Sequence, residues 1–195
     1  MVSKTRKVSF YRLSLEKQTL LPGTRTVRVT QLNNSEIEDC FREIYNEKMQ
    51  VLSDNHKAIN ITASNGHYVI EAISFEAHRA FLKIGQQNPS NTVALRDRTT
   101  LETENVPMRE SQLLELYTFC LIDFESGIVS YIGINGAPKI SAVRNLFDQT
   151  LEPGENTSAH LAAIMTDDIL QVLVRKHIIT VSYTHLRAHE TTLHL

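Results

Sequence analysis

The histidines near the C-terminus have the spacing that most suggests a metal enzyme. His185, His189 and His194 are three of the chain's eight histidines, and Glu190 lies among them. A zinc-protease helix needs two histidines four residues apart with a glutamate between them, so that both imidazoles project from one face. His189 and His194 are five apart, which separates them by about 140° around a helix. The pair with the correct spacing has no glutamate between its members. The sequence therefore predicts no metal site, and no motif in it implies a cofactor.

Asp123 could also do chemistry, because it is a carboxylate near the end of a strongly apolar run at residues 113–124. A nuclease of the restriction-enzyme type places an acid at such a hairpin, followed by a Glu/Gln-x-Lys on the next strand to hold Mg²⁺. The next run, residues 128–134 (IVSYIGI), contains neither an acid nor a lysine. We therefore expect Asp123 to be a turn or strand-end residue.

The stretch at residues 86–110 is polar and contains proline. It includes Arg96-Asp97-Arg98 and the acids Glu102 and Glu104. A loop on a rigid sheet can hold binding groups, so this stretch is a candidate functional loop. We expect it instead to be a surface excursion that binds nothing.

Positive charge is concentrated at the start of the chain. The net charge is −2 overall, yet residues 1–30 hold seven basic side chains and one acid, which leaves −8 on the rest. A basic segment of this kind can bind nucleic acid. The candidate residues are Lys4, Arg6, Lys7 and Arg12. No aromatic-and-glycine pattern of an RNA-binding sheet accompanies them, so we expect a strand whose polar face is basic and solvated.

Composition is that of a soluble globular protein, with 42% hydrophobic and 22% charged residues. No run of eighteen apolar residues predicts a membrane span, and the first fifteen residues lack the apolar core of a secretory signal. Cys40 and Cys120 lie in apolar settings, which is typical of buried thiols in a reducing compartment. We expect a cytoplasmic protein that does not bind membranes.

Apolar periodicity predicts a hairpin-rich first half. A helix is expected after Ser35, with Ser35 and Glu38 as its capping box and an apolar stripe from Ile37 to Tyr45. Asn65-Gly66 is a strong signal for a hairpin turn. The expected strands are residues 7–15, 26–32, 58–63, 67–74 and 79–85.

The second half of the chain also has the pattern of a hairpin and helices. Glu125-Ser126-Gly127 predicts a turn between strands 113–124 and 128–134. A helix ending at Thr150 is expected after Pro138, since proline suits a first helical turn. A strand at 160–165 and a helix at 167–175 follow. This order predicts an α+β fold, an antiparallel hairpin-rich sheet covered by helices. Residues 1–180 form one domain, or two lobes joined near 86–110.

Two segments resemble known sequences. The hairpin LIDFESGIVSYIG (residues 121–133), lying before a helix, loosely resembles uncharacterised prokaryotic and phage proteins of unknown function, some of them linked to phage–host conflict. That resemblance includes no invariant chemical motif and implies no functional residues. Residues 181–195 (VSYTHLRAHETTLHL) resemble translated sequencing-adapter read-through. We therefore expect the native sequence to run to about Thr180 and to continue beyond it in the natural, longer protein.

Taken together, these patterns predict a soluble, non-enzymatic interaction module with a protein partner. The alternative is a nucleic-acid-binding or nuclease component. Its catalytic part would be missing, or would lie in residues 86–110 and around Asp123.

Overall fold

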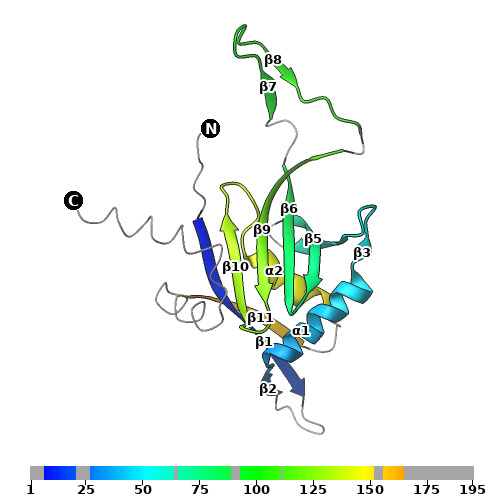
Figure 1. Ribbon diagram of the computed structural model, residues 1–195, viewed down its shortest axis with the longest axis vertical. Helices are drawn as coiled ribbons and strands as arrows, with labels where there is room; N and C mark the ends of the chain where they lie inside the picture. Colours follow the sequence, from blue (N-terminus) through cyan, green and yellow to red (C-terminus); the bar gives the residue numbers. More distant parts are fainter. Residues whose placement is uncertain are drawn as a thin grey trace, which may run out of the picture.

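An antiparallel sheet dominates the computed structural model, which describes residues 7–20, 27–63, 66–88, 93–110, 112–151 and 156–164 (Figure 1). Within those ranges the sheet has nine strands in the order β11-β1-β10-β9-β6-β5-β4-β3, with β2 also paired to β1. All the pairings are antiparallel. The strands are β1 (Lys7–Leu20), β2 (Val27–Gln31), β3 (Gln50–Val51), β4 (Lys57–Ala63), β5 (Gly66–Glu76), β6 (Arg79–Asn88), β9 (Leu114–Asp123), β10 (Ile128–Gly133) and β11 (Asn156–Ala163).

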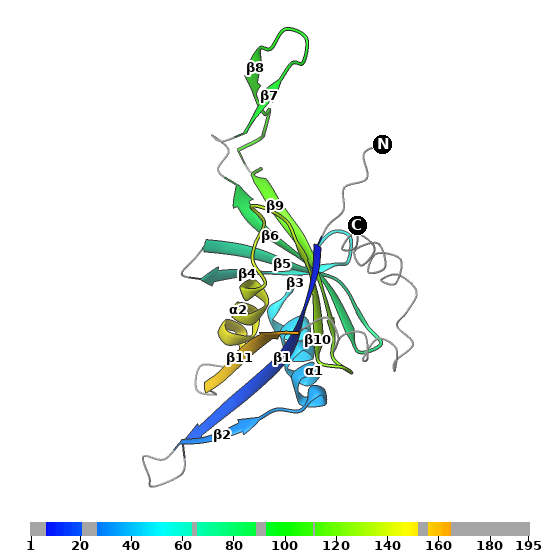
Figure 2. The same ribbon diagram turned by 90° about the vertical axis from the view of Figure 1, so that its left-hand side faces the viewer.

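Two short helices accompany the sheet. α1 (Asn34–Glu43) continues into a π-helical turn, η1 (Ile44–Lys48), and α2 (Ser141–Thr150) follows β10. α2 contacts both β4 and β11, which lie near opposite ends of the strand order. The sheet therefore curls around this helix, as the turned view shows (Figure 2).

Phe41 of α1 lies at the centre of the core and is fully buried. Its ring centroid is 5.0 Å from that of Phe75, 5.3 Å from that of Phe124 and 6.3 Å from that of Phe147. These partners come from β5, the β9–β10 turn and α2, so a single side chain joins both helices to the sheet. We call the sheet face that meets the helices the inner face.

Both predicted hairpins are confirmed. β9 and β10 pair around a turn in which Gly127 has φ +67°, a left-handed conformation that favours glycine. β4 and β5 pair from Lys57↔Ala72 to Ala63↔Gly66. The strand predicted at 79–85 is β6, and it pairs with β5. The antiparallel sheet expected from the sequence is therefore present.

The start of the first helix differs from the sequence prediction. The capping box is formed by Asn33 and Glu36, each side chain bonded to the other's backbone N–H, and not by Ser35 and Glu38. Asparagine is as good an N-cap as serine, so the helix begins earlier. Glu38 is then free to turn inward, where it is 7% exposed and bonded to Arg42 and His78.

The polar stretch at 86–110 is partly regular. Residues 86–88 extend β6, and β7 (Ala94–Arg96) pairs with β8 (Thr103–Asn105) as a separate hairpin. That hairpin projects beyond the ends of β6 and β9, away from the helices (Figures 1 and 2). We call residues 93–110 the arm. The helix expected at 167–175 and the adapter-like segment 181–195 lie outside the described residues.

No helix among the described residues is long and apolar enough to cross a membrane.

Candidate functional site

The sheet face opposite the helices carries a group of partly exposed aromatic and charged side chains. Alternate side chains on a strand point to opposite faces. On β9, Thr118, Cys120 and Ile122 are buried on the inner side, so Tyr117 and Phe119 point outward. We call this outward side the open face. Its apolar members on the central strands are Val8, Phe10, Val69, Phe81, Tyr117, Phe119, Leu121 and Ile132.

Three rings form a cluster on the open face. Phe81 and Phe119 stack with centroids 5.4 Å apart and planes at 17°. Tyr117 meets Phe119 edge-on at 5.5 Å. The cluster is accessible to solvent, since Tyr117 is 45% exposed. Single apolar residues are ordinary on protein surfaces, whereas contiguous exposed patches mark binding sites.

A row of charged groups borders the ring cluster. Its members, which we call the polar strip, are Asp54, His56, Glu71, Lys83 and Glu115. The ammonium of Lys83 lies 2.9 Å from Glu115 Oε2 and 3.6 Å from Glu71 Oε2. It also lies 5.0 Å from the centroid of the Tyr117 ring, within the range of a cation–π contact. The strip thus links the β3–β4 turn, β5, β6 and β9.

The carboxylates control the protonation of Lys83. Partial burial disfavours the ammonium, but the hydrogen bond and charge of Glu115, assisted by Glu71, outweigh it and raise the pKa of Lys83 above its ordinary value. Lys83 is therefore held as a cation that two acids already neutralise.

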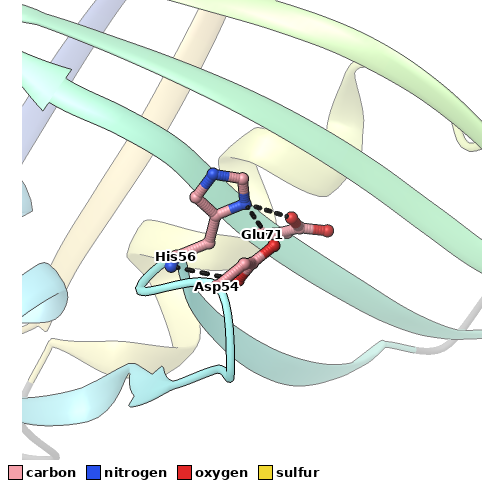
Figure 3. A group of neighbouring side chains, drawn as sticks. All are labelled: Asp54, His56 and Glu71. Carbon is pink, nitrogen blue, oxygen red and sulfur yellow. Dashed lines mark hydrogen bonds and ion pairs between the residues drawn. The ribbon is translucent and has the colours of Figure 1, made fainter.

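At one end of the strip two carboxylates face the same nitrogen of one imidazole (Figure 3). His56 Nδ1 is 2.9 Å from Glu71 Oε1 and 3.0 Å from Asp54 Oδ2. Asp54 and His56 belong to the β3–β4 turn, and Glu71 lies on β5. Such a group could move protons or donate to a cation. Among the described residues no serine, threonine or cysteine is bonded to His56, so none of these supplies a nucleophile for it to activate.

The residues predicted to bind nucleic acid do not form a site in the described part of the chain. Lys4 and Arg6 lie outside it. Lys7 and Arg12 are both on β1, whose register with β10 runs without a break from Lys7↔Gly133 to Arg12↔Ile128. Because their positions differ by five, an odd number, their side chains point to opposite faces of the sheet.

Asp123 has a local structural role. It is the last residue of β9, and its carboxylate accepts hydrogen bonds from the Glu125 N–H at 3.2 Å and the Ser126 hydroxyl at 2.9 Å. In the described ranges it belongs to no group of ligands that could hold a metal ion. Its position is that of the turn residue expected from the sequence.

Comparison with protein-family models, curated proteins and solved structures gives no match to this chain.

Sequence reasoning did not single out the polar strip. The signal available was weak: Glu71 and Lys83 are charges inside otherwise apolar strands, at positions that alternate with buried residues. Such charges are ordinary on solvated strand faces. Only the pairing of β5 with β6 and of β6 with β9 brings Glu71, Lys83 and Glu115 together.

Proposed function

We propose that the protein is a non-enzymatic interaction module that binds a protein partner on its open face. We place it in the cytoplasm of a prokaryotic or phage-infected cell, as the loose resemblance to proteins of phage–host conflict suggests. The observation that supports binding is the ring cluster of Phe81, Phe119 and Tyr117, which lies on the sheet face opposite the buried core and is partly exposed.

Aromatic side chains favour such a role for a physical reason. They offer a large apolar area with few rotatable bonds, and they are enriched at the centres of protein interfaces. Val8 and Val69, on the same face, are 45% and 38% exposed. The surface that would be desolvated on binding therefore extends over several strands.

The charges next to the rings favour a protein partner over a nucleic acid. The polar strip has three carboxylates, from Asp54, Glu71 and Glu115, against the single ammonium of Lys83. Phosphate groups would be repelled by that excess. An apolar protein surface with lysine or arginine at its margin would complement both the rings and the acids. We infer a partner of that chemistry.

The proposal is tested by selecting binding peptides from a displayed library against the full-length protein and measuring their affinity for variants. Tyr117→Ser and Phe119→Ser should each weaken binding by at least about tenfold, since interface aromatics commonly contribute more than 1.4 kcal/mol. Leu101→Ser is the matched control, because Leu101 is 65% exposed but lies on the arm.

The selected peptides should be rich in apolar residues and should include lysine or arginine. If only Leu101→Ser lowers the affinity of the peptides, the binding surface lies on the arm and not on the open face. If none of the three substitutions changes the affinity, the proposal is contradicted.

A further inference from the structure

We propose that Asp54, His56 and Glu71 form a binding site for a divalent transition-metal ion of the zinc type. This goes beyond the partner-binding role and does not depend on it. It also differs from the sequence-based expectation of no metal site, which considered the histidines of the C-terminal segment.

The three potential ligand atoms are already arranged around one point. They are His56 Nδ1 and one carboxylate oxygen each from Asp54 and Glu71, all within 4.8 Å of one another. Zn²⁺ binds nitrogen and carboxylate oxygen at about 2.0–2.2 Å, so neighbouring ligands of one ion lie roughly 3 Å apart or slightly more. The observed separations from His56 Nδ1, 2.9 and 3.0 Å, need to open by only a few tenths of an ångström.

The single hydrogen that His56 Nδ1 can carry gives a second reason to expect a cation here. A neutral imidazole nitrogen either donates one hydrogen or accepts one. His56 Nδ1 nevertheless faces two carboxylate oxygens at hydrogen-bonding distance, and one hydrogen cannot bond fully to both. A cation among the three atoms would interact favourably with the imidazole lone pair and with both negative charges.

The surrounding structure holds the ligands in place. The His56 N–H donates to the other oxygen of Asp54 at 3.2 Å, and the Leu52 N–H donates to the His56 carbonyl at 2.8 Å, which together fix the turn. Glu71 presents one oxygen to His56, while its other oxygen faces Lys83 at 3.6 Å. Contacts of this kind orient metal ligands and commonly matter for affinity.

The donor set indicates which ion to expect. One imidazole with two carboxylates suits Zn²⁺ and related transition metals, whereas Mg²⁺ prefers oxygen ligands and keeps several waters. Three protein ligands leave at least one coordination position for water or for a group from a partner. The site is therefore expected to bind Zn²⁺ and to discriminate against Mg²⁺.

The test is calorimetric titration of the full-length, metal-free protein with ZnCl₂ and, separately, with MgCl₂. His56→Ala and Glu71→Gln should each reduce Zn²⁺ affinity at this site by more than about tenfold, since each removes a ligand or weakens one. The essential control replaces His185, His189 and His194 with alanine, because these histidines could bind Zn²⁺ themselves.

The expected result is one Zn²⁺ equivalent that persists in the triple-histidine variant and disappears in His56→Ala. Circular dichroism of each variant establishes that it is folded, and Co²⁺ absorption bands that are lost in His56→Ala but kept in the triple-histidine variant provide an independent readout. Three results would overturn the proposal. They are no Zn²⁺ binding by the wild type, unchanged binding by His56→Ala, and loss of binding in the triple-histidine variant.

Discussion

The carboxylate of Glu115 lies directly over Gly85 on the neighbouring strand. A β-carbon placed at position 85 would come within 1.8 Å of Glu115 Oε1. The absence of a side chain at Gly85 is what allows Glu115 to cross the strand and reach Lys83 at 2.9 Å. The contact between Glu115 and Lys83 in the polar strip thus depends on the glycine at position 85.

This relationship predicts that the effect of Gly85→Ala depends on the residue at position 115. In the wild type the new methyl should displace Glu115, and the loss of up to about 1 kcal/mol from a partly exposed ion pair should cancel the entropic gain of alanine over glycine, so that stability changes little or falls slightly. In a Glu115→Ala background the same change should stabilise the protein by roughly 0.5–1 kcal/mol, because alanine loses less backbone entropy than glycine. Urea unfolding of the four proteins measures both effects. Equal effects in the two backgrounds would show that the contact is unimportant.

The raised pKa of Lys83 predicts a loss of stability in alkaline solution. A group whose pKa is higher in the folded than in the unfolded protein contributes stability below its unfolded pKa, and that contribution is lost as the pH rises through the folded value. For Lys83 the window begins near the ordinary value of 10.5 and extends above it. In Lys83→Met the melting temperature should therefore fall less steeply than in the wild type as the pH rises through that window. Burial also raises the pKa of Tyr131, so Tyr131→Phe should be measured in parallel to separate the two contributions.

Local signals in the sequence were sufficient for most of the elements. Gly127 and Asn65-Gly66 identified the hairpins because turns depend on neighbouring residues alone. The predicted start of the first helix was wrong because Asn33 and Ser35 are both good N-cap residues and lie two positions apart. The sequence pattern favoured Ser35, whereas the helix is capped by Asn33.

The candidate sites could not be predicted in the same way. His56 and Glu71 are 15 residues apart and meet only through the register of β4 with β5. Glu115 reaches Lys83 only because β9, far along the chain, pairs with β6. The alternation of apolar and polar residues shows which face of a strand a side chain lies on. It does not show which strands are neighbours in the sheet, because that depends on pairing between distant parts of the chain.

Phe41 should be the most sensitive position in the core. Its burial and its contacts with Phe75, Phe124 and Phe147 predict that Phe41→Ala costs about 3–5 kcal/mol of unfolding free energy. Phe119→Ala, on the open face, should cost markedly less while impairing partner binding. Guanidinium unfolding of both variants checks the contrast. A comparable loss of stability in Phe119→Ala would mean that the open face is itself packed.

Glu38 joins α1 to the β5–β6 turn. The residue is 7% exposed, and its carboxylate contacts Arg42 in the same helix and His78, at 2.7 Å, in the turn. The side chains of Arg42 and His78 are 52% and 65% exposed, so water can replace Glu38 as their partner, and the net loss should be about 0.5–1.5 kcal/mol. Glu38→Ala should show that loss in thermal unfolding. Asp39→Ala, at the exposed neighbouring position, is the control and should be close to neutral.

The opposite orientations of Lys7 and Arg12 bear on the nucleic-acid alternative. One bound strand cannot contact side chains on both faces of a sheet, and the polar strip on the open face is acidic. We therefore expect no submicromolar binding of single- or double-stranded oligonucleotides at physiological salt. Weak binding at low salt should fall steeply as salt rises, because each neutralised phosphate releases counterions. Fluorescence anisotropy at about 50 and 200 mM salt measures the affinity and its salt dependence. The measurement compares the wild type with a variant in which four residues are changed to glutamine: Lys4, Arg6, Lys7 and Arg12. Tight binding at the higher salt that disappears in the glutamine variant would establish the nucleic-acid function instead.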